Sequence, residues 1–233
     1  EVSKNGFCER ISITMMNEVS QTPIDDSNKL RSLELIVDFS SCIRQLVENS
    51  IDSGATDIAI RLDITKFFLS VSDNGKGISV VEMKDLGNIR YISSKVSTAG
   101  IYGFRGEAIH SISNLSVLEI QSRSKDSSLT CTKTISCGKT LSTTVDSTRK
   151  EHGTIVKVHD LFQNWPVRKK GLKLRVQQAR VKEMLQRLCL LNHHISFTLV
   201  DNIQHKVIWN VKASNDMLSR ICDIRDINYK QNS

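Results

Sequence analysis

The chain has 233 residues, 39% of them apolar and 24% charged, and its formal net charge at pH 7 is +7. This composition supports a sizeable core and excludes an intrinsically disordered or collagen-like protein. No apolar run approaches the roughly 18 to 20 residues of a membrane-spanning helix, and the first residues show no initiator Met and no signal-peptide pattern. We therefore expect a soluble fragment of a longer protein, without a membrane partner.

The spacing of the apolar residues predicts the elements in chain order. Residues 1–29 are polar and irregular and are expected to form an N-terminal arm. Beyond them, apolar residues recur every three or four positions in helical segments and every second position in strands. The predicted helices are 33–53, 79–89, 107–112 and 176–191. The predicted strands are 58–64, 67–71, 117–122, 130–136, 141–145, 154–158 and 195–200. This order predicts an α+β sandwich, with helices on one face of a mixed, mainly antiparallel sheet.

The cysteines and histidines predict no metal site. The six cysteines stand at scattered spacings without a CxxC pair, which favours free thiols in a reducing compartment. His193 and His194 are adjacent at the end of a predicted helix, where neighbouring side chains point in different directions.

The loop over 73–77 has the pattern Asp-x-Gly-x-Gly and follows a predicted strand. Its Asp73 carboxylate could accept a hydrogen bond from an exocyclic amine such as adenine N6, while Gly75 and Gly77 let a base approach the backbone. Asn49, on the preceding helix, could offer a neutral oxygen to Mg²⁺. These residues predict a nucleotide pocket.

A glycine-rich stretch over 103–106 precedes the predicted helix 107–112. Backbone N–H groups at such a helix start could hold phosphates, and Lys95 would add positive charge.

Five motifs in a fixed order carry a resemblance to a known family. They are Asn49 with 52–55, then 73–77, 93–95, 103–108 and 153–154. Together they resemble the GHKL ATPases, which include gyrase, Hsp90, histidine kinases and MutL. The stretches Gly-Phe-Arg-Gly-Glu-Ala and Leu-Phe-Gln-Asn-Trp-Pro-Val-Arg-Lys-Lys resemble the MutL mismatch-repair family in particular. The resemblance covers residues 30–201 and implies the GHKL (Bergerat) fold, with 202–233 as the start of a second, transducer-like subdomain.

The resemblance also implies roles for individual residues and the cofactors ATP and Mg²⁺. Asn49 would be the Mg²⁺ ligand, Asp73 the adenine acceptor, and Thr154 a neighbour of the base. Gly75 and Gly77 would form the loop that faces the base. The residues implied in a lid over the triphosphate are Ser94, Lys95, Gly103, Phe104, Arg105, Gly106 and Glu107. For Arg105 and Glu107, an ion pair that holds the lid helix is an alternative to phosphate contact.

Gln45 departs from the family at the catalytic position. In MutL-like ATPases a Glu four residues before the metal-binding Asn acts as the general base. A neutral amide can orient a water but cannot accept its proton, so we expect nucleotide binding with much-reduced hydrolysis. Glu48 is about 100° away around the helix and is expected to lie off the site. Gln45 fits either a natural loss of hydrolysis or a deliberate change that traps the ATP state.

Other departures concern the lid, a lysine and the subfamily. Only seven residues separate Lys95 from Gly103, so the lid is trimmed or a stretch of it is missing. The lysine by which the family's second subdomain reaches the γ-phosphate has no counterpart here. The stretch over 36–42 lacks the AGEV and proline signature, and together with 87–91 it looks most like the third eukaryotic MutL homologue, the meiotic branch. A PMS-type paralogue is the alternative.

Most of the net charge lies in one segment. Residues 166–187 carry eight cations and one acid, which predicts a basic helix over 166–191. The cations are Arg168, Lys169, Lys170, Lys173, Arg175, Arg180, Lys182 and Arg187. They predict salt-dependent binding to the DNA backbone without sequence preference.

The resemblance implies the N-terminal ATP-binding switch domain of a nuclear MutL homologue in mismatch repair and meiotic recombination. ATP would close the lid, join two such domains and clamp DNA, with another MutL homologue as heterodimer partner. One alternative is a non-catalytic DNA-binding module with a degenerate nucleotide pocket. Another GHKL enzyme, such as a histidine kinase or chaperone, is a third reading.

Overall fold

The computed structural model describes residues 24–87 and 107–232. The strands are β1 (Asp57–Asp63), β2 (Phe68–Asp73), β3 (Val117–Arg123), β4 (Thr130–Ser136), β5 (Lys139–Asp146), β6 (Gly153–His159), β7 (Ser196–Asp201) and β8 (Lys206–Val211). The helices are α2 (Ile24–Leu35), α3 (Phe39–Asp52), α4 (Val80–Asp85), α5 (Glu107–Leu115), α6 (Pro166–Gly171), α7 (Leu174–Leu191) and α8 (Met217–Asn232). Among these helices, none is both long and apolar enough to cross a membrane.

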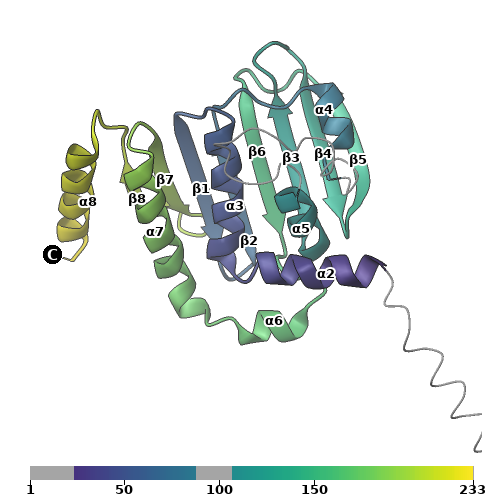
Figure 1. Ribbon diagram of the computed structural model, residues 1–233, viewed down its shortest axis with the longest axis horizontal. Helices are drawn as coiled ribbons and strands as arrows, with labels where there is room; N and C mark the ends of the chain where they lie inside the picture. Colours follow the sequence, from purple (N-terminus) through teal and green to yellow (C-terminus); the bar gives the residue numbers. More distant parts are fainter. Residues whose placement is uncertain (1–23, 88–106, 233) are drawn as a thin grey trace, which may run out of the picture.

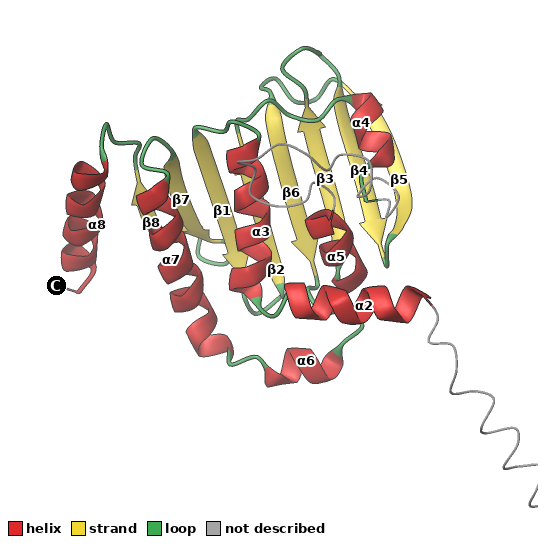
Figure 2. Ribbon diagram, in the orientation of Figure 1, coloured by secondary structure: helices red, strands yellow, loops and turns green. Residues whose placement is uncertain are grey.

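The eight strands form one sheet in the order β5-β4-β3-β6-β2-β1-β7-β8. Every neighbouring pair is antiparallel except β1 and β7, which run parallel. Figure 1 shows α3, α5 and α7 side by side across one face of the sheet, and Figure 2 shows the same two layers by element type. The predicted fold class is confirmed.

The core lies between this helix layer and the sheet. From α3, Phe39, Ile43 and Val47 are fully buried, as the three- and four-residue spacing predicts. Ile60 of β1 and Val71 of β2 face them from the sheet and are also buried. Because apolar residues alternate with polar ones along the strands, the apolar face of the sheet lies under the helices.

The predicted helix 33–53 is two helices in the structure. The reason is Asp38, whose carboxylate accepts a hydrogen bond from Ser41 N at 2.9 Å while Ser41 Oγ accepts one from Asp38 N at 2.9 Å. This reciprocal capping satisfies N–H groups at the start of α3, so a new helix begins at Phe39.

Three further boundaries differ from those predicted. The helix α2 starts at Ile24, inside the predicted arm. The predicted basic helix 166–191 is interrupted after α6, because Leu172 and Lys173 take extended or irregular backbone angles. The sheet continues past residue 201, since β8 pairs with β7, and α8 packs against α7 and β8.

Candidate functional site

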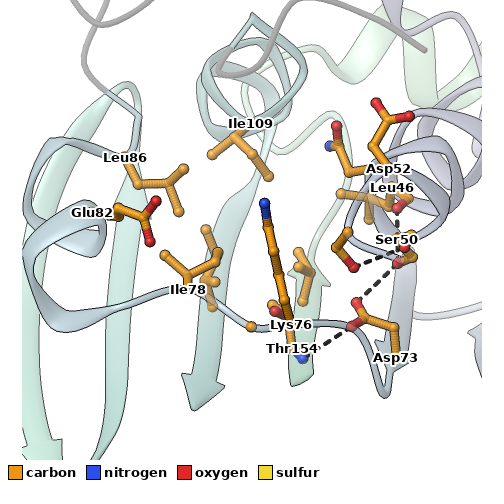
Figure 3. Close-up of a pocket in the computed structure, with 15 residues that line it drawn as sticks. Leu46, Ser50, Asp52, Asp73, Lys76, Ile78, Glu82, Leu86, Ile109 and Thr154 are labelled. Carbon is orange, nitrogen blue, oxygen red and sulfur yellow. Dashed lines mark hydrogen bonds between the residues drawn. The ribbon is translucent and has the colours of Figure 1, made fainter. Parts of the chain in front are cut away.

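A pocket lies beside α3, between the loop that follows β2 and the start of α5 (Figure 3). Its volume is about 1010 Å³, including the part that opens to solvent. Six apolar side chains form part of its walls: Leu46, Ile78, Leu86, Ile109, Ile120 and Val156. Apolar walls with a few polar groups are typical of a small-molecule site.

Asp73 is the buried polar group at one end of this pocket, and only 8% of its surface is exposed. Its Oδ1 accepts hydrogen bonds from Gly75 N at 2.9 Å and from Thr154 N at 3.2 Å. Its Oδ2 accepts one from Ser50 Oγ at 2.9 Å (Figure 3). A carboxylate has about four acceptor positions. Among the described residues, one acceptor position on Oδ2 therefore has no donor.

Burial also changes the ionisation of Asp73. Loss of solvation raises the pKa of this carboxyl above its ordinary value, although hydrogen bonds from Gly75, Ser50 and Thr154 and the positive charge of Arg149 oppose the rise. Arg149 also fixes the local backbone, because its Nη2 donates to the Asp73 carbonyl at 3.3 Å. An acceptor held in this way is ready for a donor such as an amine.

The glycines of the loop are needed for its close packing. Gly77 has a φ of +71°, and a Cβ at this position would overlap the Arg123 carbonyl. The backbone is held on both sides, since Lys76 N donates to Ser53 O at 3.0 Å and Lys76 O accepts from Lys125 N at 2.9 Å. The Asp-x-Gly-x-Gly pattern predicts a loop here, and these hydrogen bonds hold it firmly in place.

Thr154 lines the pocket from β6, as the resemblance implies. Its Oγ1 lies 2.9 Å from Ser122 Oγ, and Ser122 Oγ accepts a hydrogen bond from Ile78 N at 2.8 Å. These bonds join the loop after β2 to β3 and β6. The two sheet strands and the loop are therefore held together at the base of the pocket.

The candidate residues of α3 differ in position. Asn49 lines the pocket, whereas Gln45, one turn earlier, is half-buried and does not line it. Glu48 is turned away, as expected, because its carboxylate accepts from Arg44 Nε at 2.8 Å. Among residues 24–87 and 107–232, no group of three or more His, Cys, Asp or Glu side chains could hold a metal. The five cysteines in this part of the chain are free thiols, and Cys8 lies outside it.

Most predicted lid residues lie outside the described residues. They are Ser94, Lys95, Gly103, Phe104, Arg105 and Gly106. Glu107 opens α5 and forms an ion pair with Arg31 of α2 at 2.7 Å. This matches the ion-pair alternative for Glu107.

The eight predicted DNA-binding residues differ in exposure and in partners. Four of them have partners within the chain: Arg168 with the Leu33 carbonyl, Lys169 with Asp160, Arg180 with Asp38, and Arg187 with Glu183. Lys182 is partly buried. The remaining three, Lys170, Lys173 and Arg175, are exposed where α6 meets α7, and their side chains make no hydrogen bond or ion pair within the described part of the chain. We call these three the basic junction.

Sequence reasoning missed Ser50, which holds Asp73. A signal was present, because Ser50 stands four residues after Leu46 and so shares the buried stripe of α3. A buried hydroxyl needs a hydrogen-bond partner, and this requirement could have pointed to the pocket. Lys76, Glu82 and Leu86 were missed as well, and they line the pocket from the loop and α4.

Comparisons with known proteins identify the family of this chain. A model of the histidine kinase-, DNA gyrase B- and HSP90-like ATPases matches residues 37–161, more than half of the chain. The human DNA mismatch repair protein Mlh3 is 33% identical over 211 residues, and the Arabidopsis thaliana MLH3 is 30% identical over 213 residues. These matches cover 87% and 88% of this chain but 14% and 18% of those proteins.

A solved structure shows the same fold with a nucleotide. The Aquifex aeolicus MutL ATPase domain complexed with ADP has a TM-score of 0.69 and 26% identity, with 82% of this chain and 70% of that chain covered. The chain therefore belongs to the histidine kinase-, DNA gyrase B- and HSP90-like ATPase family, in which it is a domain of the MutL type.

Proposed function

We propose that this chain is the N-terminal ATP-binding switch domain of a MutL homologue that acts in DNA mismatch repair. The observation that carries the proposal is the buried Asp73 carboxylate, which keeps one acceptor position at the end of an apolar pocket. Adenine fits this arrangement, because its flat apolar faces suit the walls and its N6 amine can donate to Asp73. The ADP complex of the Aquifex aeolicus domain supports the same ligand class.

Calorimetry with two nucleotides tests this proposal. Adenine carries an amine where guanine carries a carbonyl oxygen, and a carboxylate repels the latter. We expect saturable binding of Mg-ATP and at least tenfold weaker binding of Mg-GTP. Equal affinity for the two nucleotides would remove Asp73 as the reader of the base, and no binding of either would remove the nucleotide function.

Asn49 is proposed as the residue that holds Mg²⁺. It lines the pocket, and its side chain makes no hydrogen bond within the described residues, so its amide oxygen is available. Mg²⁺ prefers few protein ligands and takes the rest from phosphate and water, which fits a site with a single neutral oxygen. When bound, the ion neutralises phosphate charge.

Hydrolysis is proposed to be weak. Gln45 stands one helical turn before Asn49, at the position where the family has its general base, and its amide cannot take a proton from water. We infer that this domain binds ATP for longer than it would with a carboxylate there. Release of phosphate measured against the Gln45→Glu variant tests this inference.

We propose that the basic junction contacts DNA. This assigns DNA binding to three of the eight residues that the sequence predicted. Its three cations are exposed and have no partner in the described structure, whereas four others are already paired. Lys173 and Arg175 also stand at the start of α7, whose first N–H groups have no side-chain cap and favour phosphate. Contact with phosphates alone would show no sequence preference.

A matched pair of triple variants tests the DNA contact. Replacing the basic junction by Gln should weaken binding to duplex DNA and lower the slope of log K against log salt by about 2.7, at about 0.9 for each phosphate lost. The control replaces exposed lysines elsewhere, Lys66, Lys139 and Lys206, by Gln and removes the same charge. If both variants lose affinity equally, net charge and not this surface is responsible.

Finer assignments are proposed from the relatives. Similarity to the human and Arabidopsis thaliana Mlh3 proteins favours the third eukaryotic MutL homologue, and with it a nuclear protein in meiotic recombination, over a PMS-type paralogue. ATP-driven lid closure, joining of two such domains on DNA and a heterodimer with another MutL homologue are proposed on the same ground. Residues 202–233 are proposed to lead into the second subdomain, although their strand β8 still belongs to the sheet of the first.

A non-catalytic DNA-binding module remains the competing function. Gln45 favours it, because it removes the general base, while the intact contacts of Asp73 oppose it. DNA binding that is unchanged by a saturating concentration of Mg-ATP, in a chain that shows no calorimetric ATP signal, would favour the competing function.

A further inference from the structure

A buried lysine holds the helix that forms one wall of the pocket. Lys133 lies on β4 and is 2% exposed. Its Nζ donates hydrogen bonds to the Met83 carbonyl at 2.9 Å, the Lys84 carbonyl at 2.8 Å and the Leu86 carbonyl at 2.8 Å. An ammonium group has three N–H donors, so all three are used.

These acceptors are carbonyls at the end of α4, where a helix has no partners of its own for them. The helix has six residues, which is too short to be stable by itself. Its start is held by a capping box between Ser79 and Glu82. The positive charge of Lys133 also interacts favourably with the dipole of α4, because it lies at the C-terminal end of this helix. Thus α4 depends on side chains at both ends.

The same short helix contributes to the nucleotide pocket. Glu82 and Leu86 line the pocket on the side away from Leu46 and Asp52 of α3 (Figure 3). Met83, between them in sequence, is fully buried and fixes the helix to the core. One residue further, the Gly87 carbonyl accepts a hydrogen bond from His110 Nδ1 of α5 at 3.1 Å. Lys133 of β4 therefore holds Leu86, and His110 of α5 holds the next residue, Gly87.

We propose that Lys133 is a positioning residue of the nucleotide pocket: by holding the carbonyls of α4 it keeps Leu86 at the distance from α3 that a bound nucleoside requires. This inference rests on the proposed function. Lys133 does not line the pocket, and its three donors are occupied, so it acts through α4 and not on the ligand. Its loss should weaken ATP, ADP and AMP by the same factor, whereas loss of a phosphate contact would weaken ATP most.

The test compares Lys133→Met with a matched variant, Arg220→Met. Arg220 is also a fully buried cation that donates to backbone carbonyls, those of His193 and Ile195, but at the other edge of the sheet. Each variant's Tm is measured, and ADP affinity is measured by calorimetry well below both values. We expect Lys133→Met to raise the Kd for ADP at least tenfold and Arg220→Met to leave it within twofold of the parent. Lys133→Arg, which keeps the charge and the donors, should recover part of the affinity.

A measurement on the parent chain keeps the inference testable if Lys133→Met does not fold. The ¹⁵Nζ resonance of a buried, hydrogen-bonded lysine can be followed by NMR, and saturation with ADP should shift that of Lys133 and not the guanidinium signals of Arg220. An unshifted Lys133 signal in the ADP-bound parent would overturn the inference, as would a normal Kd in Lys133→Met or an equal loss in Arg220→Met. Failure of the parent to bind ADP would instead overturn the proposed function on which the inference rests.

Discussion

Replacing Asp73 by Asn changes the pocket at a single acceptor atom. The Asn Oδ1 can keep the hydrogen bonds from Gly75 N and Thr154 N, which are 2.9 and 3.2 Å long in the parent. The new Nδ2 can donate to Ser50 Oγ, whose single proton is then free for the Leu46 carbonyl, 3.2 Å away. The contacts within the protein therefore survive the substitution. Toward the ligand, however, a donor now faces the adenine amine, which is also a donor.

The expected loss of affinity follows from the type of bond removed. A hydrogen bond to a charged group contributes about 1.5–3 kcal/mol, and 1.4 kcal/mol is about tenfold in Kd. We therefore expect the Kd for Mg-ATP to rise about 10- to 150-fold in calorimetry. Glu34→Gln, an exposed carboxylate of α2 that loses the same charge, is the control and should bind as the parent does.

Asp73→Asn should lower the affinity for ATP but raise the stability of the folded protein. Because burial raises the pKa of Asp73, the folded protein holds this proton more tightly than the unfolded chain, and the ionised group reduces stability above its folded pKa. Asp73→Asn should therefore have a higher Tm than the parent at pH 7. In the parent, ATP affinity should fall as acid titrates Asp73, and this decrease should begin at a higher pH than for an ordinary Asp. An Asp73→Asn protein that binds ATP with the parent's Kd would refute the reasoning.

Three shorter predictions concern the loop, the catalytic position and the DNA contact. Gly77→Ala should lower the free energy of unfolding by about 1–2 kcal/mol or more in urea titrations, because its φ of +71° is unfavourable for Ala and a Cβ would overlap the Arg123 carbonyl. A parent-like value would show that the loop can move. Gln45→Glu should raise ATP turnover by 10²-fold or more, the range for a general base, with unchanged ATP affinity. An unchanged turnover rate would show that the residue at position 45 does not limit hydrolysis. Replacing the basic junction by Gln should leave the ATP affinity measured by calorimetry within twofold of the parent's. A larger change would show that the basic junction and the pocket are coupled.

Much of the fold could be predicted because its signals are local. Alternation of apolar residues predicts the strands β1 and β2, and the glycines after Asp73 predict the loop. The break before α3 was missed, because the apolar spacing runs through it and Asp38 acts as a cap only with Ser41 in place. The strand β8 was missed for a different reason, since its pairing with β7 is not visible in its own pattern.

The site shows the same limit. Asp73, Asn49 and Thr154 could be assigned from motifs, because each motif is contiguous in the sequence. Ser50 and Lys133 act through partners 23 and 47 or more residues away, and such pairs appear only when the chain is folded. A buried lysine in a strand looks like an ordinary exposed cation until the carbonyls of α4 are placed beside it.

The hydrogen bonds of Asp73 connect the pocket to the order of folding. They join positions 50, 73 and 154, and the longest spans 81 residues of chain. Such distant contacts form late, because loop closure must come first. A partly folded chain, with α3 and the first hairpin alone, would lack one side of the pocket. The proposed nucleotide would therefore bind the completed domain alone, and at a concentration of 100 times Kd it would add about 2.7 kcal/mol to the stability of that state.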